Sequence, residues 1–79
     1  MSAAAQPLTS LEVGSRAVVT EIKIPAEHRG RILEMGLIVG TTIELVRFAP
    51  LGDPVEIKVR GYNLTLRKHE ADLILVKGV

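Results

Sequence analysis

The chain has 79 residues, which is enough for one small domain with a modest core. Aromatic residues make up only 3% of the sequence against 47% apolar residues, so the core must be built from Val, Ile and Leu side chains. The formal net charge is only +1, and cysteine is absent. These properties exclude a disulfide framework, a thiolate metal site and a cysteine nucleophile, and they argue against a strongly basic nucleic-acid surface.

Residues 1–7 are small and unpatterned and have neither the charged start nor the apolar stretch of a signal peptide. No apolar run approaches the roughly 18 residues that a membrane-spanning helix needs. We therefore expect a cytoplasmic protein without direct membrane insertion. Residues 1–7 are predicted to be a disordered lead-in, and residues 8–79 to be one domain.

Residues 8–14 predict a single helical turn, because Thr9 and Glu12 have the spacing of a capping box and Gly14 can end the turn. Residues 15–24 then alternate with the period of a strand. In this interpretation one face of the strand carries four side chains, namely Val18, Thr20, Ile22 and Ile24.

A helix is predicted to begin after Pro25 and to end at Met35. Proline tolerates the first helical turn, and Gly36 stands where a helix needs a left-handed residue to close its free carbonyls. In such a closure Leu37 folds back onto Ile32. Gly30 costs about 1 kcal/mol inside a helix relative to alanine, so it either starts the regular helix or allows a partner to approach closely.

The second half of the chain reads as strands separated by turns. Residues 41–46 predict a strand with Ile43 and Leu45 on one face, and residues 49–54 form a Pro- and Gly-rich loop. The remaining elements are a hairpin of strands at 55–60 and 62–67 around Gly61, a polar helical turn at 68–72 and a last strand at 73–76.

These elements predict a mainly β fold, a small SH3-like β-barrel of about five strands with one inserted α-helix and short helical turns. The inserted helix is expected to cover one open side of the barrel.

Three spaced motifs resemble one known family. They are residues 31–41, 49–54 and 59–67, the last followed by Glu70 and Ala71. Together they are similar to the FeoA family of bacterial ferrous iron transport accessory proteins over almost the whole chain. The resemblance implies an SH3-like fold, a link to transition metal ions and a cytoplasmic role beside FeoB, the permease with a GTP-binding domain. The same fold unit also occurs as the C-terminal domain of metal-responsive repressors.

Chemical sites are sparse in the sequence. The candidate metal ligands are His28 with Glu27, and His69 with Glu70 and Asp72. Adjacent polar side chains on a helical turn point apart, so a solvated surface is the favoured interpretation of both groups, and no metal site or cofactor is predicted. Nucleophile motifs and phosphate-binding loops are missing, which indicates a protein that is not an enzyme.

Two classes of binding protein remain. The favoured one regulates ferrous iron uptake by contact with the cytosolic part of a FeoB-type permease. The alternative is a stand-alone SH3-like nucleic-acid-binding or metalloregulator-type domain, but Phe48 and Tyr62 are the only aromatic residues available for stacking. Acidic residues also interrupt the basic side chains of the strands, namely Arg47, Lys58, Arg60, Arg67 and Lys68, which indicates a solvated sheet surface and no nucleic acid.

The expected partner-binding surface is the helix and the turn that follows it, because this short chain concentrates apolar residues there outside its strands. The residues assigned to that surface are Arg29, Arg31, Ile32, Glu34, Met35 and Leu37. A core role is the alternative for Ile32, Leu33 and Leu37, and it is the favoured one for Leu33. The sequence leaves weak homo-oligomer formation open.

Overall fold

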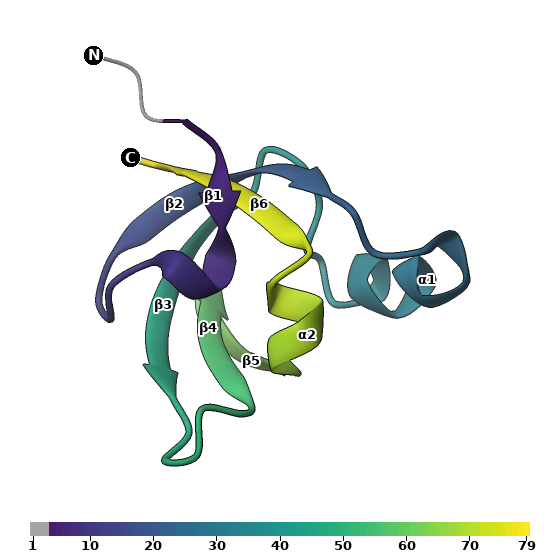
Figure 1. Ribbon diagram of the computed structural model, residues 1–79. Coiled ribbons are helices and arrows are strands. Elements are labelled where there is room, and N and C mark those ends of the chain that lie inside the picture. Colours follow the sequence, from purple (N-terminus) through teal and green to yellow (C-terminus); the bar gives the residue numbers. More distant parts are fainter. Residues whose placement is uncertain (1–3) are drawn as a thin grey trace.

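The computed structural model describes residues 4–79 and shows one curled sheet with three helical segments (Figure 1). The strands are β1 (Gln6–Pro7), β2 (Arg16–Ile22), β3 (Thr42–Phe48), β4 (Val55–Val59), β5 (Tyr62–Leu66) and β6 (Ile74–Gly78). The helical segments are the 3₁₀ turn η1 (Leu8–Ser10), the inserted helix α1 (Ala26–Glu34) and the short helix α2 (Lys68–Ala71). Residues 1–7 were predicted to be a disordered lead-in. Positions 1–3 of this segment lie outside the described residues, and Gln6 and Pro7 form β1.

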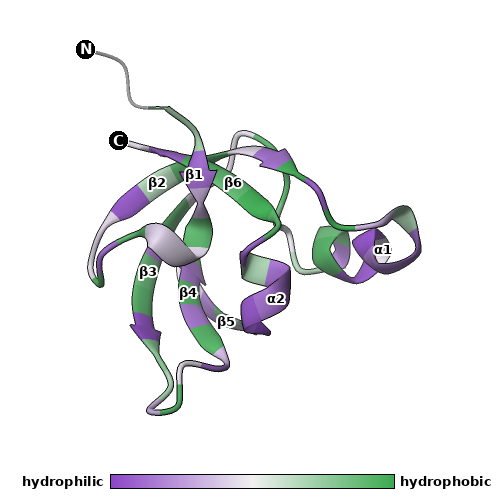
Figure 2. Cartoon of the chain, in the orientation of Figure 1, coloured by the Kyte–Doolittle hydropathy of each residue, from purple (hydrophilic) through white to green (hydrophobic). Residues whose placement is uncertain are grey.

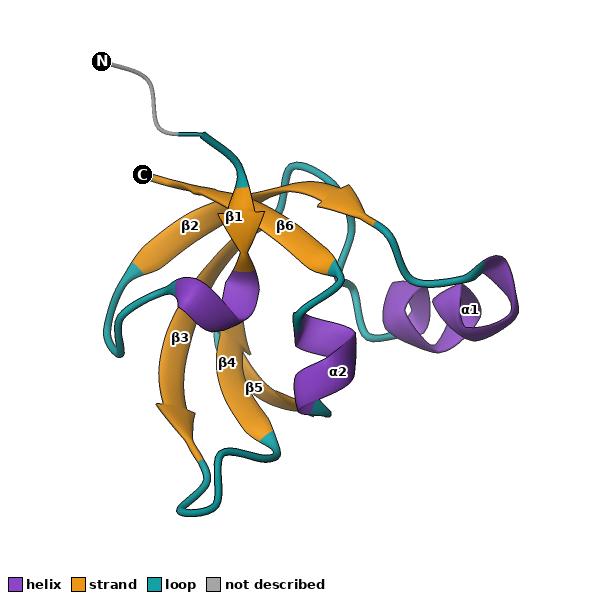
Figure 3. Cartoon of the chain, viewed as in Figure 1, coloured by secondary structure: helices purple, strands orange, loops and turns teal. Residues whose placement is uncertain are grey.

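All neighbouring strands are antiparallel, in the order β1-β6-β2-β3-β4-β5 (Figure 3). The sheet coils into the small SH3-like barrel that the sequence predicts, with β1 as a sixth strand beyond the five expected. Within the described residues β1 and β5 are the two ends of the sheet and do not pair with each other. The order therefore gives a barrel that is closed by packing rather than by a complete ladder of hydrogen bonds.

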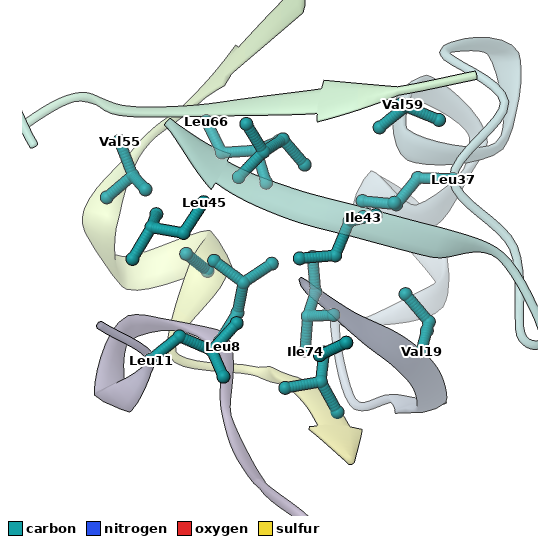
Figure 4. Close-up of a cluster of buried hydrophobic side chains, with 14 of the residues drawn as sticks. Leu8, Leu11, Val19, Leu37, Ile43, Leu45, Val55, Val59, Leu66 and Ile74 are labelled. Carbon is teal, nitrogen blue, oxygen red and sulfur yellow. The ribbon is translucent and has the colours of Figure 1, made fainter. Parts of the chain in front are cut away.

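The core is aliphatic and lies inside the curl of the sheet (Figure 4). Hydrophobic and hydrophilic residues are interspersed along the strands that surround it (Figure 2). Ile43 and Leu45 of β3 point inward as predicted, and every second residue of β4 does the same. This alternation follows from the two-residue period of a strand with one buried face. The largest fully buried side chains are Leu8, Ile24, Ile32, Leu37, Ile43, Leu45, Ile57, Leu66 and Ile74, together with Val19, Val55 and Val59.

Strand β2 differs from its prediction in the face that it buries. The inward residues are Ala17 and Val19, whereas Val18 and Thr20 are half-buried on the other face. A bulge between Val19 and Glu21 shifts the register against β6, and the Thr20 hydroxyl donates to the Leu75 carbonyl at 3.2 Å. One inserted residue reverses the facing of everything after it, so simple alternation along this strand was wrong.

Segments η1 and α2 pack against the core of the barrel. Leu8 of η1 and Ala71 of α2 are fully buried, and the Thr9 hydroxyl donates to the Asp72 carboxylate. The predicted capping box of Thr9 and Glu12 is therefore wrong, because the Thr9 side chain joins two elements distant in sequence. Helix α1 lies beside the barrel (Figure 1) and contributes Ile32 to the core, so whether it covers an opening stays a prediction.

Candidate partner-binding surface

Helix α1 ends in the left-handed glycine that the sequence predicts. Gly36 has φ of +83°, its N–H donates to the Leu33 carbonyl at 2.9 Å, and the Leu37 N–H donates to the Ile32 carbonyl at 3.3 Å. This pair of bonds is the Schellman motif, which satisfies carbonyls that a helix end leaves free. Ile32 and Leu37 are fully buried in one cluster, so the helix end is anchored in the core.

Tyr62, at the start of β5, also binds the end of helix α1. Its hydroxyl donates to the Met35 carbonyl, 27 residues away in sequence. A Cβ atom placed on Gly36 would lie 2.6 Å from the Tyr62 hydroxyl oxygen, which is too close for a side chain. Glycine is thus needed at position 36 for two independent reasons, its backbone conformation and the proximity of Tyr62.

Arg29 fastens the start of α1 to the end of β2. Its Nε and Nη2 atoms donate to the Ile24 carbonyl at 3.2 and 3.0 Å, and Nη2 also donates to the Ile22 carbonyl at 3.3 Å. Ile22 is the last residue of β2, and Ile24 lies just beyond it, where the chain leaves the sheet. The guanidinium group therefore holds the entry of the helix, because its fork of donors matches two backbone acceptors at once.

Arg31 connects α1 to α2 through an ion pair with Glu70. The Glu70 side chain is 11% exposed, and its other oxygen accepts the Arg67 backbone N–H at 3.2 Å. The hydrogen bond from Arg31 lowers the pKa of Glu70 against the opposing effect of burial, and the same bond raises the pKa of Arg31. The pair keeps the largely buried carboxylate ionised and ties the two helices together.

The six residues assigned to the surface from sequence therefore occupy different environments. Ile32 and Leu37 are in the core, and Met35 is half-buried against it. Arg29 and Arg31 are exposed but bind within the chain, and Glu34 is exposed. The structure brings these six residues into one region of the fold, and it places the two most apolar of them beneath the surface rather than on it.

The exposed apolar side chains of this region come from neighbouring positions. Leu33 is 48% exposed, so its expected place in the core was wrong. We name the helix–turn surface by its four residues, Leu33, Ile38, Val39 and Tyr62, of which the last three are 42%, 60% and 43% exposed. Seven large hydrophobic residues are exposed within residues 4–79, and four belong to this surface, so apolar exposure is concentrated there.

The turn after α1 is held in a fixed shape. The Thr41 N–H donates to the Ile38 carbonyl at 3.1 Å, and the Ile38 N–H donates to the Thr41 hydroxyl at 3.4 Å. Thr41 is buried, which places Ile38 and Val39 outward on a firm base. The run of three apolar residues between Gly36 and Gly40 was the sequence signal for this exposure, because so short a turn can bury only one of them.

Three of the candidate metal ligands, His28, His69 and Glu70, line one small pocket between α1 and α2, but they are not arranged as a metal site. His28 Nε2 lies 3.9 Å from Glu27 Oε1 on a well-exposed helix face, Glu70 binds Arg31, and Asp72 binds Thr9. Across residues 4–79 there is no group of three or more His, Cys, Asp or Glu side chains arranged to hold a metal ion. The helices in the same range are also too short and too polar to cross a membrane.

The fold and this surface define a small SH3-like barrel domain with an inserted, partly apolar helix. A family model described as the FeoA domain matches residues 6–78, so the chain belongs to the FeoA family. This confirms the resemblance seen in the sequence motifs.

Known proteins agree with this assignment. The chain is 41% identical over 70 residues to an Fe(2+) transport protein A/Fe(2+) transporter FeoB fusion protein of Porphyromonas gingivalis, covering 89% of this chain and 8% of that relative. The solution structure of a FeoA protein from Chlorobium tepidum is 39% identical with a TM-score of 0.88, covering 94% of this chain and 70% of that one. A manganese-dependent transcriptional repressor has a TM-score of 0.88 at 14% identity over 95% of this chain and 37% of its own, which shows the fold alone.

Proposed function

We propose that this protein is a small cytoplasmic accessory protein of ferrous iron uptake that acts by contact with the cytosolic part of a FeoB-type permease. The observation that carries the proposal is the Porphyromonas gingivalis relative, whose name joins Fe(2+) transport protein A to the transporter FeoB in one polypeptide. Two domains that are fused in one polypeptide commonly bind each other when they occur as separate proteins. The chain spans only 8% of that relative, so the partnership is an inference for this protein.

The helix–turn surface is the contact region that we assign. It gathers half-exposed Leu, Ile, Val and Tyr side chains around a firm turn, and such apolar and aromatic anchors contribute most of the binding energy at protein interfaces. Glu34 lies beside these residues and Arg31 completes the polar rim, although Arg31 also binds Glu70. The protein acts by binding rather than by catalysis, in agreement with its membership of a transport accessory family.

The test is a titration of the purified protein against the cytosolic part of a FeoB permease by calorimetry. Leu33→Asp and Val39→Asp each place a charge in the helix–turn surface, and we expect each to raise the Kd at least about tenfold, as for a substituted interface anchor. Both side chains are about half exposed, so these variants should remain folded.

Two matched controls are available. Val13 is 60% exposed and Leu51 is 96% exposed, and both lie outside the helix–turn surface. Val13→Asp and Leu51→Asp should bind the permease as the parent does and sustain ferrous iron uptake in cells. Equal weakening of permease binding by all four variants would refute the assignment of the helix–turn surface as the contact region. Absence of any binding by the folded parent, together with normal iron uptake after deletion of the gene, would remove the functional proposal.

A further inference from the structure

The outer face of the sheet carries an open groove that the helix–turn surface does not include. The groove has a volume of about 530 Å³ and runs across β2, β3 and β4 to the turn between β4 and β5. We name its three cations, Arg16, Lys58 and Arg60, the basic strip. Among the described residues that line it, Glu44 is the only acidic one.

The strand register places these charges side by side. Arg16 lies opposite Glu44, and Glu44 lies opposite Lys58, so the three side chains form one row across the outer face. Two other acids bind elsewhere, because Glu56 of β4 binds Arg47 and Asn63 while Glu70 of α2 binds Arg31. Glu21 of β2 does not line the groove. Within the described residues no ion pair engages a cation of the basic strip, which leaves a net positive groove.

Arg60 lies at a turn position with a positive φ, which is unfavourable for arginine. Val59 pairs with Tyr62, so Arg60 and Gly61 form a two-residue hairpin turn, with φ of +50° and +91°. Turns of this type favour Asn, Asp or Gly at the first position, because a positive φ brings the Cβ of an L-residue close to a carbonyl oxygen, at a cost of about 1–2 kcal/mol. Glycine has no Cβ, and Asn and Asp offset the cost by local hydrogen bonds. A strained residue in a site lined by like charges points to a binding role rather than a folding role.

We propose that the basic strip binds an extended acidic segment of a protein partner. Lys58 and Arg60 are two residues apart, about 7 Å, which is the spacing of alternate side chains on one face of an extended chain. Arg16 lies two strands from Lys58, about 10 Å away, with the Glu44 carboxylate between them. A single phosphate at the centre of these cations would be repelled by the Glu44 carboxylate. An extended chain with spaced carboxylates can instead contact the cations on either side of Glu44.

The groove also adjoins the helix–turn surface, because Gly40 follows Val39 and Gly61 precedes Tyr62. A partner seated on the apolar residues can therefore extend an acidic segment into the groove. The choice of a protein partner over a nucleic acid therefore rests partly on the proposed function. The groove itself is lined by glycine, threonine, isoleucine and charged residues, so it offers no aromatic side chain for a base to stack on.

The probe for this site is a fluorescent peptide of alternating glutamate and serine, titrated against the folded protein at low salt and again at 0.3 M salt. We expect binding that weakens with salt, because exposed charge pairs are screened. Arg16→Gln and Lys58→Gln should each raise the Kd about threefold, and Glu44→Gln should lower it by a similar factor. The matched control Arg47→Gln removes a cation that already binds Glu56, and it should leave the Kd unchanged.

Arg60→Asn separates a binding role from a structural one. This change gives the favoured Asn-Gly turn, so it should raise the Tm by about 3–6 °C while it weakens peptide binding. A lower Tm, or unchanged peptide binding, would overturn the role of Arg60. Equal loss of affinity in Arg47→Gln, or stronger binding of inorganic phosphate or phosphatidylglycerol vesicles than of the peptide, would overturn the site as proposed. No permease enters this assay, so its failure is distinct from failure of the proposed function.

Discussion

Substitution of Gly36 tests how α1 is joined to the barrel. Gly36→Ala adds a Cβ to a backbone with φ of +83°, which costs an L-residue about 1–2 kcal/mol. The added carbon would lie 2.6 Å from the Tyr62 hydroxyl oxygen, so Tyr62 must move and lose its bond to the Met35 carbonyl, for about 0.5–1.5 kcal/mol more. The expected loss is about 2–3 kcal/mol in the free energy of unfolding, and Gly36→Val should lose more because valine is β-branched.

Urea unfolding measures this loss, and two further variants divide it into its parts. Gly40 has φ of +94° but nothing within 4 Å of an added Cβ, so Gly40→Ala should lose only the backbone part, about 1–2 kcal/mol. In a Tyr62→Phe background the hydroxyl is gone, and the nearest remaining ring atom lies at 4.0 Å, an ordinary contact. Gly36→Ala should then cost about 1 kcal/mol less than it does in the parent. Strict additivity of the two changes, or equal losses at Gly36 and Gly40, would refute the steric part of this reasoning.

Two other expectations follow from α1 and its attachments. Gly30 lies inside the helix with open space around it, so Gly30→Ala should stabilise the protein by about 0.5–1 kcal/mol, and a lower Tm would indicate a contact that the structure does not contain. Glu70→Gln should destabilise the protein by about 1 kcal/mol at pH 7. Because folding lowers the pKa of Glu70, the ionised group stabilises the fold above the usual carboxyl pKa of about 4.3, and this contribution is lost as the pH falls through the folded-state pKa. The Tm difference between parent and variant should therefore be constant from pH 7 to 5 and shrink below that range, whereas a constant difference down to pH 2 would contradict the ion pair.

Sequence patterns predict correctly those elements that depend on interactions between residues close together in the chain. The alternation of β4 was sufficient because it has one buried face throughout, and that of β3 was sufficient as far as Leu45, before the register shift between Leu45 and Arg47. Gly36 was sufficient because only glycine accepts its conformation cheaply. The two-residue β1 is too short to show any period, and it exists through its pairing with β6. The bulge at Thr20 had no local signal either, since an inserted residue is visible only against a partner strand.

The candidate surface was predicted in position but not in detail. Ile32 and Leu33 are adjacent apolar residues, and a helix turns about 100° per residue, so a helix that contacts the barrel along one side buries only one of them. The roles of Arg29 and Tyr62 depend on carbonyls of β2 and of the helix end, which only the folded chain brings near. Long-range partners of this kind decide which polar side chains remain available to a ligand.

The adjacency of β1 and β6 has a consequence for joining this domain to other polypeptides. Gln6 pairs with Val76, so the described chain enters and leaves at one edge, on the opposite side of the molecule from α1 (Figure 1). A segment attached at either end therefore starts away from the helix–turn surface. The longest extent of the domain is 36 Å, and an extended chain covers about 3.3 Å per residue, so a tether of about a dozen residues is enough to bring an attached partner around to that surface. Such a tether holds the partner at a local concentration in the millimolar range, so even a weak contact would be occupied most of the time.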